Sequence, residues 1–397
     1  MSVLTKILQF SGYILFRPLW WLERLVPRSK NVWVFGAWYG QKYSDNSKWL
    51  YEYVLEQNPK IKAVWITKNR EVYEKLRSDG KPVCMSSSPA GAWFCMRALY
   101  ALLTSGVVDV NRFFLNGCRQ IWLWHGMPLK KILQSDDAYI AKTGLHKALS
   151  TFLNPYLRFH PYATLSSADF FNDFLMEAFD LPKEKIWNTG LPRCDAFYSE
   201  KKESFISALR LKFSNSKIFL YMPTFRMSSE MEGKAFSPFD FAYGYDEISF
   251  KEFLEKNNIV FLYKPHFVDS AVQVQIDSDH FIILNDSISD DLYVLLSSVD
   301  ALLTDYSSVF FDFIPSKKPI YLLPFDYEQY IHNSRSHYFD MYKEMTGVVC
   351  SSWREFYAAV ENEKWKSIDF EKNKKLAEFL DGKSCEKVIE RLVESCN

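Results

Sequence analysis

The chain has 397 residues, long for one domain and ample for two, and 48% are hydrophobic, so a large core can be buried. Its 48 Lys and Arg balance its 48 Asp and Glu, which argues against a nucleic-acid-coating protein, since duplex binding normally shows as a basic excess. The seven cysteines are widely spaced and include no Cys-x-x-Cys pair, so neither a zinc site nor a disulfide framework is expected.

Residues 1–28 are rich in aromatic, aliphatic and basic side chains. Lys6 and Arg17 bound an apolar stretch that is too short to span a bilayer, and Trp20-Trp21-Leu22-Glu23 offers no small-residue cleavage site for a signal peptide. We assign residues 1–28 to an amphipathic helix in the membrane interface. A helix docked on the protein's own core explains the same pattern.

From residue 31, short apolar runs alternate with longer amphipathic runs, which is typical of βαβ units around a parallel sheet. We expect strands at 32–35, 63–67, 102–104, 121–124, 163–165 and 185–187, and helices at 47–56, 71–78, 89–100 and 169–179. These elements predict an N-terminal Rossmann-like domain over residues 29–198.

Residues 138–162 interrupt this series. They are basic, rich in Leu, Phe and Tyr, and contain no acidic residue. A membrane-facing insertion is one hypothesis, and a pair of surface helices is the other.

A second alternating series begins near residue 200. It predicts strands at 218–222, 260–263, 281–284, 301–304 and 320–323, and helices at 250–257, 291–298, 307–314 and several places after 352. The fold class is therefore α/β, with two Rossmann-like domains whose parallel sheets face a central cleft, the second over residues 199–397. Ligands of such sheets bind at the carboxyl ends of the strands.

The first candidate site residue is His125, which follows the strand at 121–124. Gly126 and Pro128 place it in a loop, and Pro128 suits the first turn of a helix, whose N-terminus favours an anion. A neutral imidazole there would accept a proton from an attacking hydroxyl. A structural histidine that bonds the backbone is the alternative.

Two further candidates follow the next strands. Thr224 and Arg226 come after 218–222 and offer a hydroxyl and a fork-shaped cation, both suited to phosphate. Lys264 and His266 flank Pro265 after 260–263, and this pair suits a pyrophosphate. Ordinary surface turns carry the same residue types.

The last candidates are Asp305, Ser307 and Ser308, after the strand at 301–304. The serines fall at the expected start of a helix, where hydroxyls and unbonded N–H groups cradle phosphate. A plain Asp/Ser helix cap predicts the same pattern.

Several well-known motifs are missing. The sequence has no Gly-x-Gly-x-x-Gly, no P-loop, no His-Glu-x-x-His and no Gly-x-Ser-x-Gly, which argues against nicotinamide enzymes, P-loop kinases, zinc proteases and serine hydrolases. Asp277-Ser278-Asp279 precedes a strand rather than following one, so it does not indicate a metal-dependent sugar transferase.

Taken in order, seven motifs resemble those of the CDP-glycerol:poly(glycerophosphate) glycerophosphotransferase family, the teichoic acid primases and polymerases. The matching residues, which span about 31–345, are Asp45-Asn46-Ser47-Lys48, His125-Gly126-Met127-Pro128-Leu129-Lys130-Lys131, Gly190-Leu191-Pro192-Arg193-Cys194-Asp195, Pro223-Thr224-Phe225-Arg226, Lys264-Pro265-His266, Thr304-Asp305-Tyr306-Ser307-Ser308 with Phe311-Asp312, and Asp326-Tyr327-Glu328-Gln329-Tyr330. The chain departs from the family at Met127, usually Thr, at Phe267, often Pro, and at Gln134-Ser135-Asp136, usually Gly-x-Asp. These departures leave the acceptor open.

The resemblance implies a GT-B fold, with the donor held mainly by the C-terminal domain, and peripheral attachment to the cytoplasmic face of the membrane. It also implies transfer of glycerol phosphate, or ribitol phosphate, from a CDP-activated donor to a lipid-linked teichoic acid or capsule-type acceptor, with release of CMP. No cofactor is evident apart from the CDP-glycerol or CDP-ribitol substrate. No metal ligands are assigned, and the questions of Mg²⁺ and of oligomeric state stay open.

In the expected mechanism, an acceptor hydroxyl attacks the donor phosphorus and CMP leaves. His125 is the catalytic base, and His266 supports the leaving group together with Lys264 and Arg226. Thr224, Ser307 and Ser308 hold phosphate, and Asp305 orients its neighbours or the nucleotide. Two other classes remain: a GT-B glycosyltransferase that uses a nucleotide-sugar in capsule or lipopolysaccharide synthesis, and an inactive membrane scaffold.

Overall fold

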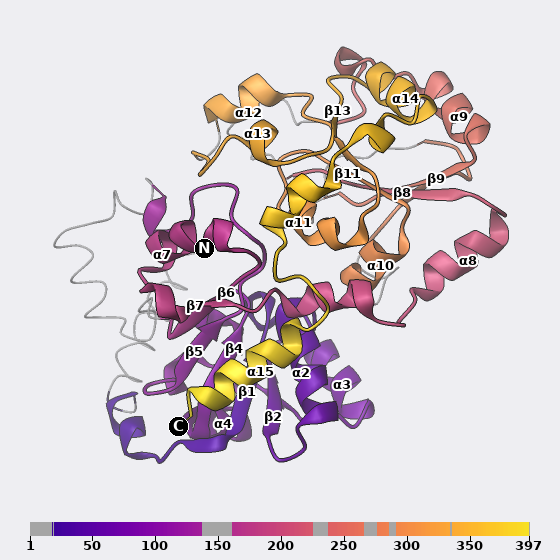
Figure 1. Cartoon of the computed structure of the whole chain (residues 1–397). Helices are drawn as coiled ribbons and strands as arrows, with labels where there is room; N and C mark the ends of the chain where they lie inside the picture. The colour runs from indigo at the N-terminus through magenta and orange to yellow at the C-terminus, as the bar shows by residue number, and fades with distance from the viewer. Residues whose placement is uncertain are drawn as a thin grey trace, which may run out of the picture.

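The computed structural model describes residues 18, 20–136, 161–224, 237–265, 276–285, 291–333 and 336–396. These residues form two lobes, each built on a parallel sheet (Figure 1). The expected α/β class with two Rossmann-like units is confirmed. We call the part around β1–β7 the first lobe and the part around β8–β13 the second lobe.

The first lobe has a seven-stranded parallel sheet with helices on both faces (Figure 1). In the sheet order β3-β2-β1-β4-β5-β6-β7, its strands are β3 (Val83–Met85), β2 (Lys62–Thr67), β1 (Ser29–Gly36), β4 (Ala98–Leu103), β5 (Arg119–Trp122), β6 (Ala163–Ser166) and β7 (Ile186–Asn188). Its helices include α2 (Asp45–Gln57), α3 (Arg70–Ser78), α4 (Pro89–Arg97) and α7 (Asn172–Phe179).

The predicted end of one helix in the first lobe is wrong. The helix expected at 89–100 stops at Arg97, and Ala98 opens β4, which pairs with β1 at Ser29 and again from Trp33 to Gly36. Pairing in the centre of the sheet overrides the local helical pattern of these residues. The short edge strand β3, which is only partly buried, was not expected.

The second lobe has a six-stranded parallel sheet in the order β10-β9-β8-β11-β12-β13. In that order the strands are β10 (Phe281–Ile283), β9 (Ile259–Tyr263), β8 (Lys217–Met222), β11 (Ala301–Thr304), β12 (Ile320–Leu322) and β13 (Val348–Val349). Its helices are α8 (Ser204–Lys212), α9 (Glu247–Lys256), α10 (Leu292–Ser298), α11 (Val309–Phe313), α12 (Tyr327–Asn333), α13 (Met341–Glu344) and α14 (Trp353–Glu361).

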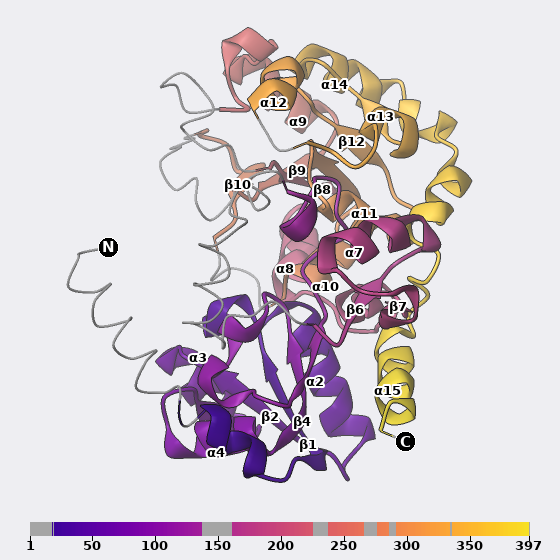
Figure 2. The ribbon, with the colours of Figure 1, turned by 90° about the vertical axis from the view of Figure 1, so that its left-hand side faces the viewer.

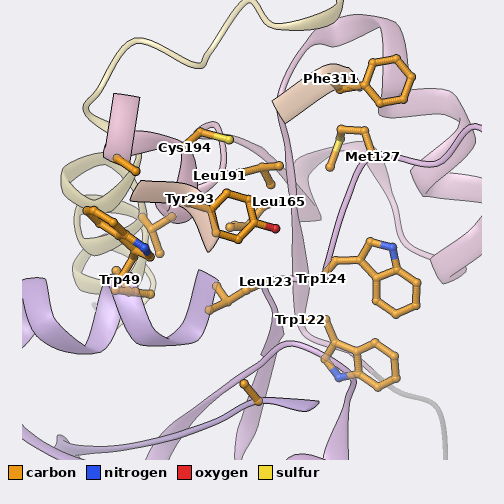
Figure 3. Close-up of a cluster of buried hydrophobic side chains, with 14 of the residues drawn as sticks. Trp49, Trp122, Leu123, Trp124, Met127, Leu165, Leu191, Cys194, Tyr293 and Phe311 are labelled. Atoms are coloured by element: carbon orange, nitrogen blue, oxygen red, sulfur yellow. The ribbon is translucent and has the colours of Figure 1, made fainter. Parts of the chain in front are cut away.

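Alternate side chains of β8 face two different cores, as the two-residue period of a strand requires. Ile218 and Leu220 join a core that continues into the first lobe, whereas Phe219 and Tyr221 join a separate aromatic core around Trp353. At the junction, Tyr293 of α10 lies near Leu191 and Cys194 of the chain that links the lobes (Figure 3). The lobes therefore pack directly on each other on this side.

The chain returns to the first lobe at its end. Helix α15 (Ser384–Glu394) buries Val388, Ile389 and Leu392 and lies along the first lobe (Figures 1 and 2). The hydroxyl of Tyr100 in β4 donates to the carbonyl of Leu392 at 2.9 Å. The predicted second domain, residues 199–397, includes this helix, but its apolar face packs on the first lobe instead. The remaining domain boundaries stay predictions.

Residues 1–17 and most of 138–162 lie outside the described residues, so the predictions made for them are not tested. In the described part of the chain, no helix combines the length and the apolar character needed to cross a bilayer.

Candidate functional site

His125 lies at the carboxyl edge of the first sheet, just past β5, as the sequence predicts. Its half-buried ring lies near Trp124 and Trp38, with ring centroids 4.2 and 5.6 Å away. Its Nδ1 is 3.5 Å from the main-chain oxygen of Thr104. A carbonyl only accepts, so this contact favours a proton on Nδ1. In that tautomer Nε2 is the ring nitrogen that can accept a proton.

The loop after His125 does not start a helix, so the expectation for Pro128 is wrong. Lys130 instead forms an isolated antiparallel bridge with His337 of the second lobe. The Lys131 amide donates to Ser336 at 2.7 Å, and the Tyr338 amide donates to Leu129 at 2.9 Å. Main-chain bonds between lobes replace the helical bonds that the local sequence favours.

In the second lobe, Thr224, Lys264 and Asp305 lie together past the ends of the adjoining strands β8, β9 and β11. The Lys264 amide donates to the Tyr221 oxygen at 2.9 Å, which fixes the start of its loop. Asp305 is fully buried, and its Oδ1 accepts the amides of Thr224 at 2.8 Å and Tyr306 at 2.6 Å. This geometry fits the expected role of orienting neighbours.

Ser307 and Ser308 are half-buried and precede α11, which has only five residues. The Val309 amide donates to the Ser307 hydroxyl at 3.4 Å, and Ser308 is the N-cap residue but caps no amide through its side chain. The serines therefore lie at a helix start, as expected, although the helix begins at Val309 rather than at 307.

The two lobes meet between His125 and these serines. Gly126 has φ +151°, and a Cβ built on it would lie 2.6 Å from the Ser308 hydroxyl and 3.4 Å from a guanidinium nitrogen of Arg193. Only a residue without a side chain fits this approach. The histidine loop of one lobe and the serine segment of the other are therefore neighbours. Arg226 and His266 lie outside the described residues.

A buried ion cluster lies next to this meeting point, and the sequence predicts no role for its residues. Arg193 is 1% exposed and comes from the short helix η9 (Pro192–Tyr198) that links the lobes. Its guanidinium donates to Asp45 of α2 at 2.8 Å and to both carboxylate oxygens of Asp312 in α11, at 2.9 and 2.7 Å. Burial raises the pKa of Asp312 even though Arg193 opposes the shift.

Asn46 is a further buried residue for which the sequence predicts no role. Its buried amide donates to the carbonyls of Leu123 at 3.1 Å and Trp124 at 2.8 Å, and accepts the Arg193 amide at 3.1 Å. Asn46, Arg193 and Asp312 all fall within the family-like motifs, so a signal was present. The sequence alone did not show that these motifs touch each other.

In the described segments, no group of three or more His, Cys, Asp or Glu side chains is arranged so that it could hold a metal ion.

Comparison with known proteins assigns the family. Residues 20–394 match the family model for CDP-Glycerol:Poly(glycerophosphate) glycerophosphotransferase. A teichoic acid glycerol-phosphate transferase of Staphylococcus aureus is 26% identical over 366 residues, which cover 88% of this chain and 86% of that protein. A teichoic acid poly(glycerol phosphate) polymerase of Bacillus subtilis is 25% identical over 94% of this chain, which spans 50% of that longer protein.

The solved structures support the fold. The wall teichoic acid polymerase TagF has a TM-score of 0.74 at 18% identity, with 100% of this chain and 98% of that chain covered. A UDP co-structure of MnaA from S. aureus has a TM-score of 0.56 at 12% identity, with 92% of this chain and 97% of that chain covered. At such identities these likenesses concern the fold alone.

Proposed function

Since the chain belongs to the CDP-glycerol:poly(glycerophosphate) glycerophosphotransferase family, we propose that it transfers a polyol phosphate from a CDP-activated donor to a teichoic acid acceptor and releases CMP. CDP-glycerol is the donor we favour because the family description names it, and CDP-ribitol is the alternative. The acceptor is a lipid-linked polymer or its primer.

The single observation that carries this proposal is the approach of Gly126 to Ser308. It sets the residue after the proposed base against the proposed phosphate-holding segment of the other lobe. A base and a phosphate must be neighbours for an in-line transfer, and catalysis of this kind consists mostly of positioning and charge stabilisation.

In the proposed reaction, Nε2 of His125 takes the proton of the acceptor hydroxyl as its oxygen attacks the donor phosphorus that carries the polyol. A new P–O bond forms, the P–O bond to CMP breaks, and CMP leaves with its negative charge. Lys264 and the hydroxyls of Thr224, Ser307 and Ser308 hold the diphosphate. Arg226 and His266 add cationic support in this scheme.

A donor panel tests the activity. Purified protein and a lipid-linked teichoic acid primer as acceptor are incubated with CDP-glycerol, CDP-ribitol, a UDP-sugar or CMP-sialic acid, each with and without EDTA, and nucleotide release is measured. We expect CMP release from a CDP-polyol. Release from a nucleotide-sugar alone would instead identify a glycosyltransferase, and no release from any donor would identify an inactive scaffold.

The base is tested by His125→Ala. Removing a proton acceptor of this kind lowers the rate by about 10²–10⁴-fold. We expect CMP release to fall in that range while the Kd for CDP-glycerol, measured by calorimetry, stays within about twofold. Unchanged turnover would remove His125 from the mechanism.

We also propose that the protein attaches peripherally to the cytoplasmic face of the membrane. Residues 20–28 support this proposal, because a charged side chain is buried there while apolar side chains are exposed. The carboxylate of Glu23 points inward, 2% exposed and bonded to Arg28 at 3.0 Å, whereas Trp21 and Leu25 are 54% and 79% exposed. Trp93 of α4 is also exposed. An apolar outer face beside basic groups suits the interface of an anionic bilayer.

Vesicle flotation tests this attachment. The double variant Trp21→Ser and Leu25→Ser should lose most binding to vesicles of anionic phospholipid. Leu211→Ser is the matched control, because Leu211 is 87% exposed but lies on α8 in the second lobe. Equal binding of both variants and the unaltered protein would contradict the assignment of this face.

A further inference from the structure

We propose that Asn46 is a positioning residue for His125, and that Arg193 ties this position to the second lobe. The inference rests on the proposed function of His125 as base. Neither residue touches the reacting atoms in this scheme. Both act by fixing where the base stands relative to the phosphate.

The backbone around His125 is strained. Trp38, Asp45 and Trp124 have φ values of 47°, 66° and 57°, a left-handed conformation that side chains rarely adopt. Such conformations are energetically unfavourable and persist only where surrounding contacts hold them. Several strained residues next to one histidine indicate that the fold must hold this histidine in a particular position.

Asn46 supplies those contacts for the strand end. Its two amide hydrogens meet the carbonyls of Leu123 and Trp124, the two residues directly before His125. Its oxygen meets the amide of Arg193. Carbonyls only accept and the amide only donates, so this set of partners fixes the orientation of the Asn46 side chain. No other residue type of this size offers two donors and an acceptor in this arrangement.

Arg193 extends the same connection across the lobes. The Arg193 amide bonds to Asn46, as described above. Its guanidinium bonds both to Asp45, the neighbour of Asn46, and to Asp312 in α11. Ser308 occupies the N-cap position of α11, so Asp312 and the serine segment belong to one short element. The Trp38 indole also donates to Asp45 at 3.1 Å, and the Trp38 ring faces His125. One buried network therefore holds the histidine loop and the serine segment in register.

The decisive variant is Asn46→Asp, which keeps the size and the acceptor for Arg193 but loses both donors to the strand end. A displacement of about 1 Å at a reacting group costs about 10²-fold in rate. We expect kcat for CMP release to fall by about that factor, with the Kd for CDP-glycerol within about twofold.

The matched control is Tyr198→Phe. It removes a 2.7 Å hydrogen bond from Tyr198, at the far end of η9, to the carbonyl of Leu380, and should leave kcat unchanged. Should Asn46→Asp fail to fold, Arg193→Lys carries the same test, because it keeps a cation between the two carboxylates but loses the planar fork. We expect it to lower kcat by about tenfold at unchanged donor Kd.

Epistasis separates positioning from general damage. In a His125→Ala background, Asn46→Asp should cause no further loss of turnover, because no base remains to be placed. A full additional loss, or a donor Kd that rises in step with the loss of kcat, would overturn the inference. So would a kcat for Asn46→Asp equal to that of the unaltered protein while His125→Ala is inactive. Full activity of His125→Ala would instead refute the proposed base itself.

Discussion

The two edges that meet at the candidate site are held in different ways. In the second lobe, Asp305 joins the ends of the adjacent strands β8 and β11 by accepting the amides of Thr224 and Tyr306. In the first lobe, the residues before His125 are bonded to Asn46, which lies 77 and 78 positions away in the chain. The network then continues through Arg193 into the other lobe.

The difference shows which half of the site depends on assembly. The phosphate-side edge follows from its own sheet, because neighbouring parallel strands end side by side. The position of the base follows only when α2, η9 and α11 come together. Perturbing the buried cluster should therefore affect both lobes, whereas perturbing Asp305 should affect mainly the second.

The largest effect on stability is expected for Arg193→Met. It leaves the buried carboxylates of Asp45 and Asp312 without their counter-ion, and breaking such a cluster costs about 3–5 kcal/mol. Urea unfolding measures this change. The triple variant that adds Asp45→Asn and Asp312→Asn should recover most of the loss, because no buried charge remains. A loss below about 1 kcal/mol for Arg193→Met would show that the cluster does not hold the lobes.

A pH effect is expected at the first-lobe edge. Asp109 accepts the amides of Tyr39 and Thr104, and burial raises its pKa to about 6 from an ordinary 3.8. The folded state then binds the proton more tightly than the unfolded state. The contribution of Asp109 to stability is full below about pH 4 and is lost, by on the order of 3 kcal/mol, as pH rises to about 6. Urea unfolding between pH 4 and 7 should show a smaller fall in stability for Asp109→Asn than for the unaltered protein. Equal slopes would contradict the assignment.

A smaller effect is expected for Asp305→Ala. Two main-chain N–H groups lose their acceptor, which costs about 1–3 kcal/mol, and the loop of Thr224 shifts. The Kd for CDP-glycerol should rise by about tenfold, as measured by calorimetry. The control Asp305→Asn keeps the accepting oxygen and should bind the donor nearly as well as the unaltered protein. A donor Kd raised equally in both variants would assign the effect to the lost charge instead.

The smallest effect is expected for Lys48→Gln, which removes the 2.7 Å ion pair between Lys48 and Asp291 at the lobe junction. Asp291 still accepts hydrogen bonds from the Trp49 indole at 3.2 Å and from the Tyr293 amide at 2.8 Å, so its charge keeps two donors. The two side chains are only 13% and 9% exposed, so we expect a loss of about 1–2 kcal/mol in urea unfolding, with unchanged turnover. A loss as large as that of Arg193→Met would show that the two junction pairs are equivalent, contrary to the comparison above.

The alternation of strands and helices is readable from the amino-acid sequence, as are the positions of His125, Thr224, Lys264, Asp305 and Ser307 at strand ends. These are local features, since apolar periodicity and strand-ending residues act over a few positions. Where local pattern and sheet pairing disagreed, as at Ala98, pairing prevailed. The half-buried edge strand β3 carried too weak a pattern to be found.

The contacts between the motifs depend on how the chain packs in three dimensions. The contacts of Arg193 with Asp45 and Asp312 join residues 148 and 119 positions apart, and no spacing rule encodes them. The extended backbone of residues 129–131 depends on main-chain hydrogen bonds with residues 336–338. The position of α15 depends on a surface of the first lobe. Buried polar groups take whichever partner the assembled fold supplies, so their roles emerge only after the lobes have packed.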